Sequence, residues 1–69
     1  MGQYEDLTQE QIEKLSNLIA KYMKVTLDDA RGMVYEEYDL AEELIYSSKK
    51  IKDAAKKFVS TLNELYRIA

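Results

Sequence analysis

The sequence contains no cysteine and no histidine. Without cysteine the chain can form no disulfide and no thiolate metal site, and without histidine the ordinary zinc and haem ligand sets are missing as well. A domain of this size buries roughly 60% of its unfolded surface when it folds. We therefore expect no metal or cofactor, and we expect self-association or a protein partner to supply additional burial.

Proline is also absent, and glycine occurs only at positions 2 and 32. So few turn-forming residues favour helices with short connections and disfavour β-hairpins. No apolar run approaches the ~18 residues of a membrane span, and the N-terminal sequence MGQYEDLTQ is neither basic nor apolar. We therefore expect neither a signal peptide nor a membrane segment, and we expect a cytoplasmic location.

The first helix is predicted over residues 9–24. Thr8 followed by Gln11 three residues later is typical of a capping box, and Leu7 and Ile12 occupy the two positions of a hydrophobic staple. One face of this helix carries the apolar residues Ile12, Leu15, Leu18, Ile19, Tyr22 and Met23.

A second helix is predicted over residues 27–46, with Thr26 as its N-cap and Asp29 at the N3 position. Its apolar residues form two adjacent strips, which suits a helix that packs against two others. One strip holds Leu27, Ala30, Val34, Ala41 and Ile45, with Tyr38 at its edge, and the other holds Met33, Leu40 and Leu44.

Glu37 does not fit this second helix. It projects between the two strips, where an unpaired carboxylate would cost several kcal/mol. Either a lysine or a tyrosine hydroxyl pairs with it, or the helix breaks near residue 38, where Asp39 and Glu42 also fit a capping box. A single helix over 27–46 is the preferred interpretation.

The third helix is predicted over residues 49–68, because apolar residues recur along it at steps of four and three. They are Ile51, Ala55, Phe58, Leu62, Leu65 and Ala69, and Ser47 or Ser48 would supply the N-cap. The competing architecture is one helix over 27–68, stable only in an intertwined dimer. The predicted fold is an all-α three-helix bundle, with a flexible segment over 1–7 and a single helical domain over 8–69.

Charged residues are sorted by segment. Between residues 26 and 46 the acids Asp28, Asp29, Glu36, Glu37, Asp39, Glu42 and Glu43 accompany Arg31 alone. Residues 47–69 carry Lys49, Lys50, Lys52, Lys56, Lys57 and Arg67 against Asp53 and Glu64. The simplest interpretation is that two neighbouring helices attract each other, although exposed pairs are worth only ~0–1 kcal/mol each.

The preferred candidate site is a protein-binding surface on the predicted second helix. Glu36, Asp39 and Glu43 follow one outer face at helical spacing, and Tyr35 and Tyr46 fall beside them. Exposed tyrosine is enriched at protein interfaces. We predict that these five residues bind a basic partner. The alternative is an ordinary solvated face that at most holds a hard cation loosely.

A nucleic-acid site is the second, less favoured candidate. Lys49, Lys52 and Lys56 share an outer face of the predicted third helix, with Arg67 further along it. The sequence pI of about 4.9 is unlike that of a typical nucleic-acid-binding domain. No aromatic residue interleaves with the lysines to stack on bases.

Nothing in the sequence indicates catalysis. The hydroxyl nucleophiles Ser47, Ser48, Ser60 and Thr61 have no recognisable activating partner, and no glycine-rich phosphate loop is present. The sequence favours a small non-enzymatic protein-interaction domain that acts through helical surfaces and self-associates. A DNA-binding or antitoxin-like regulator is the second hypothesis, and an acidic inhibitor that mimics nucleic acid is the third.

Overall fold

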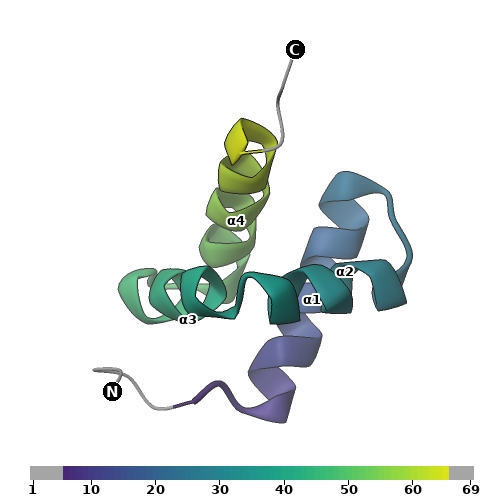
Figure 1. Cartoon of the computed structure of the whole chain (residues 1–69). Helices are drawn as coiled ribbons and strands as arrows, with labels where there is room; N and C mark the ends of the chain where they lie inside the picture. The colour runs from purple at the N-terminus through teal and green to yellow at the C-terminus, as the bar shows by residue number, and fades with distance from the viewer. Residues whose placement is uncertain (1–5, 66–69) are drawn as a thin grey trace.

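The computed structural model describes residues 6–65, and this part of the chain contains helices and no strands. The helices are α1 (Gln9–Met23), α2 (Leu27–Glu36), α3 (Tyr38–Ser47) and α4 (Ile51–Leu65). The predicted all-α class is confirmed, but three helices is the wrong number, because the second predicted helix is divided. Figure 1 shows α2 and α3 following one another in a row, with α4 rising from the α3 end.

Helix α1 begins as the sequence predicts. The Thr8 hydroxyl oxygen accepts a hydrogen bond from the backbone N–H of Gln11 at 3.1 Å, and the Gln11 side chain accepts one from the backbone N–H of Thr8 at 2.8 Å. Leu7 and Ile12, the predicted staple residues, are both buried in the same core. The segment predicted to be flexible, 1–7, lies mostly outside the described residues, and Leu7 at its end is part of the core.

The second predicted helix is interrupted at Glu37, which ends α2 and begins α3. Thr26 caps α2 as predicted, since its hydroxyl oxygen accepts a hydrogen bond from the Asp29 N–H at 3.1 Å. At Glu37 the backbone takes φ −112° and ψ 45°, away from helical values. The single helix over 27–46 is therefore wrong, and the chain adopts the alternative, a break near residue 38.

The break lets the two halves bury their apolar residues against different helices. Helix α2 packs against α1 and buries Ala30 and Val34, whereas α3 packs against α4 and buries Ala41. A straight helix would aim Glu37 into the core, but at the break its side chain is only partly buried. Asp39 lies inside the first turn of α3 and does not cap it, so tertiary packing sets the break rather than the suspected capping box.

Helices α3 and α4 are separate, which contradicts the single helix over 27–68. Ser48 leaves α3 in an extended conformation, with φ −104° and ψ 147°. Helix α4 begins at Ile51, two residues after the predicted start, and its first turn closes when the Lys50 carbonyl accepts a hydrogen bond from the Ala54 N–H at 3.1 Å. The predicted end, with Tyr66, Arg67 and Ala69, lies outside the described residues.

The core forms where α1 meets α2 and α4. Phe58 of α4, Leu15 and Ile19 of α1 and Val34 of α2 are fully buried. Fully burying a side chain of this kind stabilises a fold by about 1.5–3 kcal/mol. The predicted apolar stripe of α4 faces the interior through Phe58 and Leu62, whereas Leu65 is 54% exposed.

Candidate partner-binding surface

The five residues predicted to bind a partner all lie exposed on the outer side of α2 and α3. They are Tyr35, Glu36, Asp39, Glu43 and Tyr46, which we call the acidic face. Tyr35 is 51% exposed and Tyr46 is 41% exposed, so both rings offer apolar surface to solvent. Because α2 and α3 follow one another across the molecule (Figure 1), the acidic face extends over both helices.

Tyr35 is held in place from behind by Tyr38. The two rings are stacked, with centroids 6.5 Å apart and planes 13° from parallel. The Tyr38 hydroxyl oxygen in turn accepts a hydrogen bond from the backbone N–H of Leu7 at 2.8 Å. An exposed aromatic side chain that is already ordered loses little conformational entropy on binding. Sequence analysis gave Tyr38 no such role, because its contact with Leu7 joins residues 31 positions apart in the sequence.

A groove of about 320 Å³ opens beside the acidic face. Met23 of α1, Met33 of α2 and Leu62 of α4 give it an apolar lining, and Glu36, Glu37 and Asn63 line it as well. We call it the methionine groove. Sequence analysis assigned both methionines to apolar helix faces and did not predict the groove, since it depends on how α1, α2 and α4 come together.

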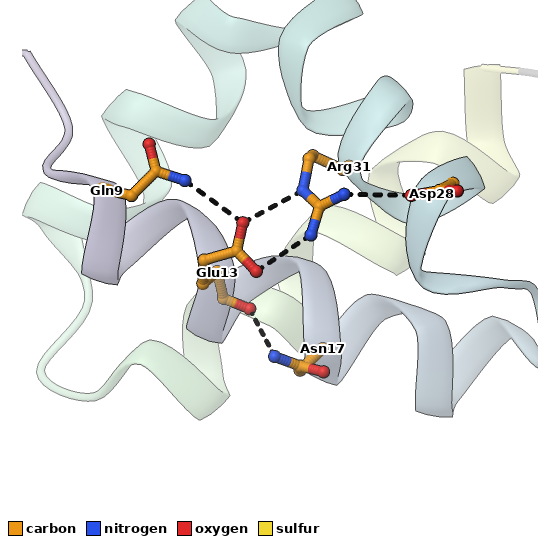
Figure 2. A network of polar contacts seen from close by, with 5 residues as sticks. All are labelled: Gln9, Glu13, Asn17, Asp28 and Arg31. Atoms are coloured by element: carbon orange, nitrogen blue, oxygen red, sulfur yellow. Dashed lines mark hydrogen bonds and ion pairs between the residues drawn. The ribbon is translucent and has the colours of Figure 1, made fainter.

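Arg31 is the centre of a polar network between α1 and α2 (Figure 2). Its Nε and Nη2 atoms donate to the two carboxylate oxygens of Glu13, each at 3.0 Å, and its Nη1 donates to Asp28 Oδ1 at 3.0 Å. Gln9 Nε2 also donates to Glu13, at 3.2 Å, and the Asn17 side chain donates to the Glu13 carbonyl at 2.9 Å.

This network changes the electrostatics of α2. The hydrogen bond from Arg31 lowers the pKa of Glu13 below its ordinary value of 4.5, and the same bond raises the pKa of Arg31. Arg31 is the single cation between residues 26 and 46. Since Glu13 and Asp28 already pair with it, it does not offset the negative charge of the acidic face.

The sorted charges do not pair as the simplest interpretation expected. Helix α3 does pack against α4. Between residues 6 and 65, however, the ion pairs join Glu10 to Lys14 and join Arg31 to Glu13 and Asp28, and none joins α3 to α4. Direct ion pairs therefore do not contribute to the packing of α3 on α4 in the described part of the chain.

The four candidate nucleic-acid residues do not all belong to one site in the described part of the chain. Lys49, Lys52 and Lys56 are all exposed. Lys49 and Lys56 line one hollow, together with Lys57, which sequence analysis did not select, whereas Lys52 is not part of its lining. Arg67 lies outside the described residues.

Two further classes of site were tested against the described residues. Within residues 6–65 no group of three or more acidic side chains is arranged to hold a metal ion. No helix in the same range is both long enough and apolar enough to cross a membrane.

Comparison of the chain with protein-family models, with curated proteins and with solved structures found no match.

Proposed function

We propose that this protein is a non-catalytic interaction domain that binds a basic, amphipathic helix of a protein partner along the acidic face and the methionine groove. One observation carries the proposal: Glu36 belongs to both surfaces. A partner helix can therefore place an apolar side chain in the groove while its basic side chains lie against the carboxylates. This is the helix-in-groove mode of peptide recognition.

The lining of the groove supports an apolar anchor. Met23 and Met33 are partly exposed, and methionine side chains adapt their shape to a partner because they are unbranched and polarisable. Buried apolar anchors at the centre of an interface usually contribute most of its binding energy. Tyr35 and Tyr46 offer additional contact area on the acidic face.

The charge supports a basic partner. Asp39 and Glu43 are exposed on α3, Glu36 is exposed on α2, and none of the three has an ion-pair partner within the described residues. Complementary charge raises the association rate and suppresses wrong partners more than it raises affinity. The groove would then provide affinity, and the acidic face would select for basic sequences.

The experiment compares two charge reversals of equal size. Changing Glu36, Asp39 and Glu43 to Lys is expected to abolish capture of a partner from source lysate, while circular dichroism shows an intact fold because these side chains are exposed. Changing Lys49, Lys52 and Lys56 to Glu is the matched control and should leave capture intact. Met33→Glu places a charge in the groove and should also abolish capture.

The competing function, nucleic-acid binding, predicts the opposite ranking. Affinity for DNA would survive the acidic-face reversal, disappear with the lysine reversal, and fall steeply with salt because lysine contacts release counterions. A gel shift on genomic fragments with both triple variants makes this comparison, and that result would overturn the protein-partner proposal. A cytoplasmic location remains a prediction from the sequence.

A further inference from the structure

A second hollow, of about 360 Å³, lies at the corner between α3 and α4. It is lined by residues of the lysine-rich segment 47–69, not of the acidic segment 26–46. The six lining residues are all polar or charged, namely Ser47, Ser48, Lys49, Asp53, Lys56 and Lys57. The three lysines bring ammonium groups from the connection and from two positions of α4 around one concave surface. Within residues 6–65 none of them is in an ion pair.

Lys49 precedes the first turn of α4, whereas Lys56 and Lys57 lie in its second turn. The N-terminal end of α4 carries the positive end of the helix dipole, where basic side chains are unfavourable and anions are stabilised. Asp53, at the third helical position, supplies one negative charge to this end. The remaining charge in the lining is positive. Three lysines against one aspartate leave an excess of positive charge around the hollow, which suits an anion.

Ser48 contributes a hydroxyl group that forms no hydrogen bond within the described residues. Its Oγ atom is buried and has no hydrogen-bond partner, which costs about 1–3 kcal/mol for a buried polar group. Ser48 also lines the hollow together with the three lysines, so its hydroxyl is a candidate donor to a ligand there. An anionic oxygen bound there would accept a hydrogen bond from it as well as those from the lysines.

We propose that this hollow binds a phosphate group of a small phosphorylated ligand. Lysine ammonium groups bind phosphate as point charges, and a serine hydroxyl adds a directed donor. A nucleic acid is the less suitable ligand. Its phosphates continue along a strand, and on the adjoining α3 that strand would meet the exposed carboxylates of Asp39 and Glu43.

Inorganic pyrophosphate is the probe for the test, with binding followed by calorimetry and by backbone amide shifts of the wild-type chain in low salt. Lys56→Gln and Lys57→Gln are each expected to weaken binding about tenfold, since each removes a charged hydrogen bond. Lys52→Gln is the matched control, because it removes the same charge from α4 without touching the lining. It should change the affinity less than about twofold.

Two further variants test the arrangement without removing a lysine. Asp53→Asn removes the one carboxylate of the lining and should tighten binding. Ser48→Ala keeps the net charge and should weaken binding while leaving the fold as stable or more stable, since it removes an unpaired buried hydroxyl.

Equal weakening by Lys52→Gln and Lys56→Gln would overturn the proposal, because it would indicate diffuse attraction rather than a site. Absence of pyrophosphate binding at about 10 mM would also overturn it. Tighter binding of duplex DNA than of pyrophosphate would do the same and would assign the lysines to nucleic acid.

Discussion

The hydroxyl oxygen of Tyr38 accepts a hydrogen bond from the backbone N–H of Leu7, 31 positions earlier in the chain. This contact joins the start of α3 to the residues that precede α1. Tyr38 sits immediately after the break at Glu37, and its ring supports the exposed ring of Tyr35. Tyr38, just after the break, therefore contributes both to the fold, through Leu7, and to the acidic face, through Tyr35.

We predict that Tyr38→Phe destabilises the fold by about 1–2 kcal/mol, because the Leu7 N–H loses its acceptor in a partly buried place. The ring and its stacking are retained, so packing is unchanged. Tyr35→Phe is the control, since its side chain is 51% exposed, and it should change stability by less than about 0.5 kcal/mol. Urea unfolding measures both, and equal values for the two variants would contradict the role given to Tyr38.

The pH dependence of the free energy of unfolding should show a specific contribution from the Glu13 carboxylate in acid. Its pKa is lowered by the hydrogen bond from Arg31, so its stabilisation is complete above the unfolded value of about 4.5 and is lost as pH falls through the lower folded pKa. Wild-type protein should therefore exceed Glu13→Gln in stability at neutral pH, and the two should converge in strong acid. Between about pH 6 and 9 the wild-type melting temperature should change little, because no histidine or cysteine titrates there.

Glu10→Gln is the control for this experiment. Glu10 pairs with Lys14, but the Glu10 side chain is 75% exposed, so the pair is screened by solvent. This variant should follow the wild-type curve over the whole pH range. A Glu13→Gln curve that runs parallel to wild type down to strong acid would contradict the lowered pKa.

Local signals predicted the starts of α1 and α2 well, because each capping residue and its partner are close neighbours in the sequence. Thr8 with Gln11 and Thr26 with Asp29 act as the sequence indicates. The break at Glu37 was only an alternative, since no glycine, proline or side-chain cap marks it. The acidic face could be predicted from helical spacing alone, whereas the methionine groove and the lysine hollow depend on which helices meet.

Lys24 offers a test of the α1 terminus. Its backbone is in the left-handed region, at φ 58°. The backbone N–H of the following residue, Val25, donates a hydrogen bond to the Ala20 carbonyl at 3.1 Å, as in a Schellman motif. We predict that Lys24→Gly is more stable than Lys24→Ala by about 1 kcal/mol, because glycine adopts this conformation without strain. Both variants lose the same charge, so thermal unfolding isolates the backbone effect. Equal stability of the two would contradict it.

Self-association remains a prediction from the short chain and its lack of disulfides. Between residues 6 and 65 nearly all apolar residues are buried or partly buried, and the large apolar side chains left exposed are Tyr35, Tyr46 and Leu65. We expect sedimentation equilibrium at tens of micromolar to show species larger than a monomer. Tyr35→Ser with Leu65→Gln should shift them toward monomer. A monomer mass for the wild-type chain together with high thermal stability would show that the bundle needs no partner copy.

Substitutions at Gly32 test the stability of the fold and partner binding on the acidic face separately. It is exposed in α2, and a β-carbon added there would have no atom within 4 Å. Gly32→Ala should therefore stabilise the fold by about 0.5–1 kcal/mol, the usual gain at an open helical site.

On the helix surface Gly32 neighbours Tyr35 and Glu36, which follow it by three and four residues. A partner helix lying across the acidic face would approach the backbone closely at this point. Gly32→Trp should thus abolish capture by bulk alone while the chain stays folded, and Gly32→Ala should retain capture. Ser60→Trp, at an exposed position of α4, is the control for a large aromatic elsewhere on the surface. If Gly32→Trp bound the partner as well as Ser60→Trp does, the proposed binding surface would be wrong, because no helix could pack across α2 with an indole ring at its centre.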